Sequence, residues 1–90
     1  MTVTQLQKCW KAFKEGGDTE ARNALIRNYA YLVKITAGRV VATLPPGLDR
    51  EDLISAGTIG LIKAVDQFDP KREVKFETYA IALIRGAILE

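Results

Sequence analysis

One side of the segment from 76 to 90, drawn as a helix, gathers an aromatic ring, a hydroxyl, a guanidinium and two small residues: Thr78, Tyr79, Ala82, Arg85 and Gly86. A short basic run stands just before it: Lys71, Arg72 and Lys75. Single-stranded nucleic acid is held by bases that stack on aromatic rings and by cations that follow the phosphates. The pattern therefore indicates a nucleic-acid site, although a tyrosine on a helix surface usually has no such role.

The segment from 50 to 68 has two apolar sides. Successive helical residues lie about 100° apart, and one continuous arc of about 120° contains its core positions: Leu53, Ile54, Gly57, Leu61, Ala64, Val65 and Phe68. Ile59 and Ile62 fall roughly opposite that arc, among polar residues. A helix with two apolar sides is either covered on both by its own chain or binds a partner. We expect a docking surface for a foreign helix, with coverage by a neighbouring segment as the alternative.

Gly57 and Gly60 lie inside the predicted helix at 50–68, where each costs about 1 kcal/mol relative to alanine. Gly57 falls within the apolar arc and Gly60 at its edge. We therefore predict that both glycines allow another helix backbone to approach closely.

Ninety residues with a net charge of +2 suffice for one small domain with a modest core. The chain has no histidine, so the commonest acid–base residue and metal ligand is missing. Ser55 and Thr58 have no histidine or lysine base at a suggestive spacing. We expect neither an enzyme nor a bound cofactor.

The single cysteine, Cys9, can form no internal disulfide, which fits a reducing cytoplasm. It lies near Leu6, Trp10 and Phe13 and is expected to be a small core residue rather than a reactive thiol. No apolar run approaches about 18 residues, so neither a signal peptide nor a membrane span is expected. We expect a cytoplasmic protein with no membrane partner.

The elements that position these residues are predicted to be four helices, at about 4–15, 19–41, 50–68 and 76–90. The first carries apolar residues at helical spacing: Val3, Leu6, Trp10 and Phe13. The second has a predicted buried stripe: Ala21, Leu25, Tyr29, Leu32, Thr36 and Val40. The fourth has a predicted core stripe: Phe76, Ala80, Leu83, Ile84, Ala87 and Ile88.

The predicted helix ends carry recognisable stop and start signals. The pair Gly16-Gly17 ends the first helix, and the Leu-Pro-Pro-Gly stretch at 44–47 ends the second. Asp18 and Asp49 are predicted N-caps. With no strand signal and no long linker, the fold class is all-α, a compact four-helix domain over residues 1–90.

The stretch DREDLISAGTIGLIKAVDQFDPKREVKFETYAIALIRGAILE, residues 49–90, resembles the second domain of a bacterial RNA polymerase sigma factor. The upstream CWKAFKEGGDTEARNALIRNYAYLVKITAGRV resembles the region that precedes it, so the likeness covers nearly the whole chain. DLISAGTIGLIKAVDQFDP together with KFETYA and IRGAILE is most similar to flagellar and sporulation-type alternative sigma factors.

This resemblance implies two partners. The helix matching residues 52–66 would dock on the clamp coiled coil of the polymerase largest subunit, through Asp52, Ser55, Ala56, Thr58, Ile59 and Ile62. The segment matching 71–90 would capture the melted non-template strand of the promoter −10 element, through Lys71, Arg72, Lys75, Thr78, Tyr79 and Arg85. Tyr79 would stack on a flipped base. An anti-sigma protein would compete for the clamp-binding surface.

The chain departs from housekeeping sigma factors at two places. Ala82 and Leu83 stand where those proteins carry a tryptophan pair, so promoter melting is expected to be less robust. Ser55 and Ala56 replace a longer glutamine–glutamate pair, so the clamp contact is expected to depend more on Asp52 and the isoleucines. The uncapped ending at Glu90 leads us to expect a piece of a longer protein.

Two functions of different classes remain open from the sequence. The first is a non-enzymatic initiation module that connects polymerase to promoter DNA. The second is a stand-alone helical module that binds an anti-sigma protein and no DNA. Binding to single-stranded promoter DNA in the presence of core polymerase separates them, because only the first requires it.

Overall fold

The computed structural model describes all residues from 1 to 90 and contains four helices and no strand. The helices are α1 (Val3–Gly16), α2 (Thr19–Val41), α3 (Arg50–Gln67) and α4 (Phe76–Leu89). Their ends differ from the ranges expected from the sequence by no more than one residue. The all-α fold class is confirmed. None of the helices combines the length and the apolar character that crossing a membrane requires.

Side-chain caps fix the starts of three helices. The Asp18 carboxylate accepts hydrogen bonds from the backbone N–H groups of Glu20 and Ala21, and Asp49 accepts one from Glu51, so both predicted N-caps are confirmed. Thr2 and Gln5 form a capping box at the start of α1. Gly17 adopts a left-handed conformation (φ 65°) that ends α1 and lets the chain reverse toward α2.

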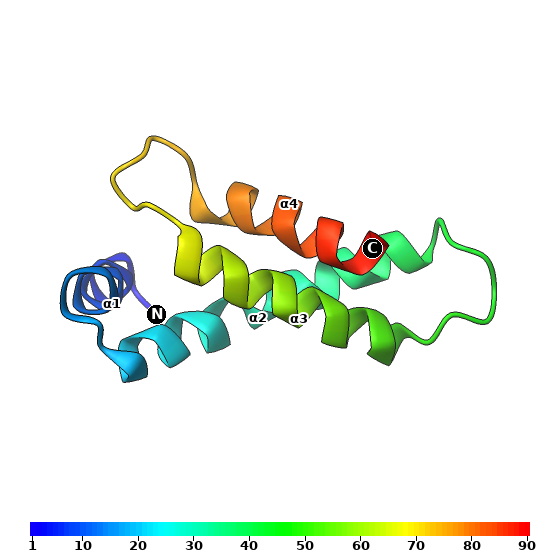
Figure 1. The fold of residues 1–90 in the computed structure, drawn as a ribbon, viewed down its shortest axis with the longest axis horizontal. Coiled ribbons are helices and arrows are strands. Elements are labelled where there is room, and N and C mark those ends of the chain that lie inside the picture. Colours follow the sequence, from blue (N-terminus) through cyan, green and yellow to red (C-terminus); the bar gives the residue numbers. More distant parts are fainter.

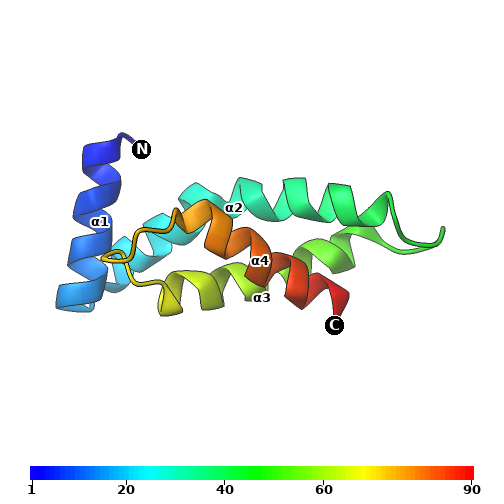
Figure 2. The ribbon, with the colours of Figure 1, turned by 90° about the horizontal axis from the view of Figure 1, so that it is seen from above.

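The molecule is elongated, with extents of 44 × 25 × 22 Å. The helices α2 and α3 run side by side along its length, and α4 lies across both of them (Figures 1 and 2). The short α1 stands crosswise at one end, next to the start of α2 (Figure 2). This arrangement leaves one side of α3 and one side of α4 without cover from the chain.

The core is continuous along α2, α3 and α4 and ends in an aromatic cluster beneath α1. In this cluster the rings of Trp10, Tyr29, Phe68 and Phe76 lie with neighbouring centroids 4.4 to 5.2 Å apart. Cys9 is half-buried and packs against the core's edge. Val3, in the first turn of α1, is 73% exposed.

The two glycines of α3 have different neighbours. A Cβ atom on Gly60 would lie 2.7 Å from the carbonyl oxygen of Leu83 and 2.9 Å from Cα of Ile84, both in the backbone of α4. A Cβ atom on Gly57 would instead meet side chains, at 3.0 Å from Val33 and 3.2 Å from Ile84. The close backbone approach is therefore confirmed at Gly60, whereas Gly57 makes room for core side chains.

Candidate functional site

The outward side of α3 carries the residues expected to dock a partner. Asp52 and Ser55 are exposed. Ile59, a large apolar residue, is also exposed, at 57%. Ala56, Thr58 and Ile62 are half-buried. The Thr58 hydroxyl donates to the carbonyl oxygen of Ile54 at 2.8 Å, so it is already occupied within its own helix. No segment of the chain covers Ile59, whereas Ile62 is partly covered.

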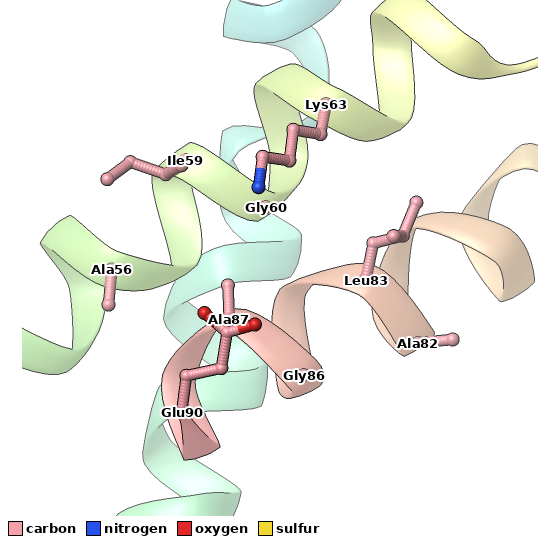
Figure 3. Close-up of a pocket in the computed structure, with 9 residues that line it drawn as sticks. All are labelled: Ala56, Ile59, Gly60, Lys63, Ala82, Leu83, Gly86, Ala87 and Glu90. Atoms are coloured by element: carbon pink, nitrogen blue, oxygen red, sulfur yellow. The ribbon is translucent and has the colours of Figure 1, made fainter.

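A groove of about 230 Å³ lies between α3 and α4. Ala56, Ile59 and Gly60 line its α3 side, and α4 contributes Ala82, Leu83, Gly86 and Ala87 (Figure 3). Lys63 and Glu90 also line it, and their charged ends extend over the space between the helices (Figure 3). Leu83 and Ala87, expected in the core stripe of α4, are only half-buried because they form this groove. The groove therefore brings Ala56 and Ile59, from the predicted docking side of α3, next to Ala82 and Gly86, from the predicted nucleic-acid side of α4. Helical periodicity predicts these as two separate surfaces.

Most residues expected to contact nucleic acid lie at the N-terminal end of α4 and in the connection before it, whereas Arg85 lies toward the C-terminal end of α4, next to the groove residue Gly86. Lys71, Arg72 and Lys75 are exposed, as are Thr78 and Arg85. Tyr79 is half-buried, and its ring centroid lies 5.6 Å from that of Phe68, with the planes at 42°. Tyr79 therefore rests on the residue that follows α3, with part of its ring open to solvent.

A second pocket, of about 330 Å³, surrounds this ring; here we call it the Tyr79 pocket. Its lining residues are Gln67, Phe68, Asp69, Arg72, Val74 and Tyr79. It brings the Arg72 guanidinium and the Tyr79 ring, both expected from the sequence, into one site. Phe68 and Val74 were missed as site residues. Val74 could have been found from the sequence, because it is an apolar residue in an otherwise polar connection. It is 50% exposed in the structure.

One ion pair lies close to the Tyr79 pocket. The Arg22 guanidinium binds the Asp66 carboxylate through Nε–Oδ1 at 2.7 Å and Nη2–Oδ2 at 3.0 Å. The hydrogen bond from Arg22 and its charge lower the pKa of Asp66, and the same bond raises the pKa of Arg22. Burial lowers the pKa of Lys14, whose ammonium lies beside Asp66 and Asp69.

The family model described as sigma-70 region 2 matches residues 25–90. The chain belongs to the sigma-70 region 2 family. It is 43% identical over 84 residues to the RNA polymerase sigma-D factor of Bacillus subtilis, covering 93% of this chain and 33% of that protein. It is also 43% identical over 70 residues to the RNA polymerase sigma factor FliA of Pseudomonas aeruginosa, covering 78% of this chain and 28% of that protein.

These findings confirm the resemblance drawn from the sequence, both to the sigma family and to its flagellar-type members. The chain spans about a third of the length of these relatives. The sigma-70 region 2 match includes all of α3 and α4 and therefore both candidate surfaces.

Proposed function

We propose that this chain is the sigma-factor domain that connects core RNA polymerase to the melted −10 element of a promoter. The observation that carries the proposal is the family match over residues 25–90, which contain both candidate surfaces. Such a domain works by binding two partners, so the proposed role asks for no catalysis by this chain. Transcription in bacteria takes place in the cytoplasm, which is where this role would place the protein.

The polymerase contact is assigned to the outward side of α3. An exposed Ile59 beside the small Ala56 and an unpaired Asp52 forms an apolar patch with a charged rim. Patches of that composition suit a helical partner with its own apolar stripe, because an apolar centre and a polar rim are typical of protein interfaces. We propose that the polymerase clamp coiled coil binds this patch and that an anti-sigma protein competes for it.

The DNA contact is assigned to the Tyr79 pocket and the cations around it. The ring of Tyr79 offers a stacking surface and Arg72 a cation within the same pocket. Lys71 and Lys75, on either side of Arg72 and Val74 in the chain, are exposed and would follow the phosphates, as would the exposed Arg85 farther along α4.

The test measures binding of a dye-labelled, single-stranded oligonucleotide pool to the chain with and without core polymerase. We expect binding that requires both proteins, and Tyr79→Ala should weaken it by about 1 to 3 kcal/mol. Tyr79→Phe should be milder, because the ring remains. Lys75→Ala is the matched control, since it should weaken all sequences equally and lower the salt slope.

A second outcome would favour the other function. If the chain captures an anti-sigma protein but never retains single-stranded DNA with polymerase, it is an interaction module and the DNA assignment is wrong. A loss of more than about 2 kcal/mol in the stability of Tyr79→Ala would likewise mark the ring as a core residue rather than a binding surface.

A further inference from the structure

Basic side chains from two other helices bind the C-terminal end of α3. A helix end carries unpaired carbonyl groups and a partial negative charge, which nearby cations stabilise. The last turn of α3 has no basic residue of its own. Instead, Lys14 of α1 donates from Nζ to the backbone carbonyl of Asp66 at 2.6 Å, and Arg22 of α2 binds the Asp66 carboxylate. Lys14, Arg22 and Asp66 are called the Asp66 junction below.

The residues directly after the junction form one wall of the Tyr79 pocket. Gln67, Phe68 and Asp69 follow Asp66 in the chain and line one side of the pocket, while Arg72, Val74 and Tyr79 complete it. The backbone leaves the helix at Phe68, which is extended (φ −65°, ψ 137°). The direction in which the chain leaves α3 therefore decides where this wall stands.

Phe68 transmits that position to Tyr79. Its ring is 9% exposed and lies 5.2 Å from Trp10 and 5.6 Å from Tyr79, measured between centroids. Because the open face of Tyr79 is set by the ring on which it rests, a shift of Phe68 would turn the stacking surface. The Arg22 and Asp66 side chains are 30% and 40% exposed, and ion pairs this exposed contribute little to stability.

We propose that the Asp66 junction is a positioning device: Lys14, Arg22 and Asp66 hold the exit of α3 so that Phe68 and Tyr79 present their aromatic surface to an unpaired base. The inference rests on the proposed function of the Tyr79 pocket. It assigns to α1 and α2 a part in nucleic-acid binding without direct contact with the nucleic acid.

The test is a double-mutant cycle between Arg22→Gln and Tyr79→Ala, read as affinity for the single-stranded oligonucleotide pool in the presence of core polymerase. Arg22→Gln should lower the affinity by about three- to tenfold when Tyr79 is present and should have no further effect in Tyr79→Ala, because groups that act through one another are not additive. A merely structural role would give the same fold-change in both backgrounds. Asp66→Asn breaks the same pair from the other side and serves as the second variant.

Two controls separate geometry from charge. Arg27→Gln removes a cation from an exposed position on the same helix and should leave the affinity nearly unchanged. The exchanged pair, Arg22→Asp with Asp66→Arg, should recover most of the affinity, since it restores the pair and suits both helix ends. The single tryptophan, Trp10, packs on Phe68, so its emission should shift in Arg22→Gln and return in the exchanged pair.

Additive losses, or a loss in Arg22→Gln no larger than in Arg27→Gln, would overturn the positioning role. If Tyr79→Ala lowers the affinity while Arg22→Gln does not, the junction fails and the proposed function stands. If Tyr79→Ala itself changes nothing, the DNA assignment of the pocket fails, and the positioning role with it.

Discussion

At the scale of single residues, Ile59 is the clearest exception to burial on α3. Its side chain is 57% exposed, whereas the opposite side of the helix carries the buried Leu61, Ala64 and Val65. Ile59→Arg should leave the stability unchanged and should weaken binding to the proposed partner, the clamp coiled coil, at least about tenfold, because a charge buried without a partner costs more than 1.4 kcal/mol. Urea unfolding and a binding titration measure the two effects. Ile35→Arg, on the exposed side of α2 at 46%, is the matched control. Unfolding of Ile59→Arg would show that Ile59 is a core residue.

Gly60 is the residue on which the packing of α3 against α4 depends most. Alanine would gain helix propensity but place a Cβ atom 2.7 Å from the carbonyl oxygen of Leu83. We expect Gly60→Ala to lower the free energy of unfolding by about 1 to 3 kcal/mol, because the two backbones must move apart. Gly86→Ala is the control on α4: no atom lies within 4 Å of its added Cβ. It should stabilise the fold by about 0.5 to 1 kcal/mol. A neutral Gly60→Ala in thermal or urea unfolding would contradict the close approach.

At the scale of the elements, the end of α3 links stability to pH. The hydrogen bond from Arg22 of α2 and the charge of Lys14 of α1 lower the pKa of Asp66. Asp69 is the other carboxylate that faces Lys14. A lowered folded pKa gives stability that is complete above the ordinary value of 3.8 and is lost as the pH falls through the folded pKa. We therefore expect the urea midpoint to fall by a small amount as the pH drops below about 4, because a pair this exposed contributes little, and to fall less in Asp66→Asn. Glu73→Gln, which is exposed, should follow the unmodified chain. Equal slopes for Asp66→Asn and the unmodified chain would contradict the pair.

The helices themselves follow from local sequence signals. Caps at Asp18 and Asp49 and the glycine at 17 set their ends, and each residue of the predicted stripe of α2 is buried. Val33 and Ala37 are also buried but were not predicted, because α3 and α4 both pack on α2 and widen its buried arc beyond one stripe. The spacing of apolar residues identifies the side of a helix that faces one neighbouring helix, whereas burial depends on every helix that packs against it.

At the scale of the whole molecule, charge limits how the chain meets DNA. Its net charge is +2, so few counterions would be released from an intact duplex. We expect the isolated chain to bind duplex promoter DNA no more tightly than the roughly 10⁻⁶ to 10⁻⁴ M range of non-specific binding. A titration at several salt concentrations measures it. Tight binding that salt does not weaken would contradict this expectation.

The candidate site depends on tertiary structure more than the helices do. The exposure of Ile59 could be predicted because it follows from position on one helix. The Tyr79 pocket could not, because Phe68 and Val74 reach it only through the path of the connection between α3 and α4. The groove between α3 and α4 was missed for the same reason: it needs the crossing of the two helices, and periodicity within each helix carries no information about that crossing.

The order of packing has a consequence for how fast the chain folds. Each helix packs on the next one in sequence. Among non-adjacent helices, α2 packs along α4, whereas α1 reaches α3 and α4 only at their ends, through Lys14 on Asp66 and Trp10 on Phe76. Helical domains dominated by contacts of short sequence separation fold in microseconds to milliseconds, because little loop-closure entropy is lost before contacts form. Folding of this domain should therefore be too fast for manual mixing and should be measured by temperature-jump relaxation.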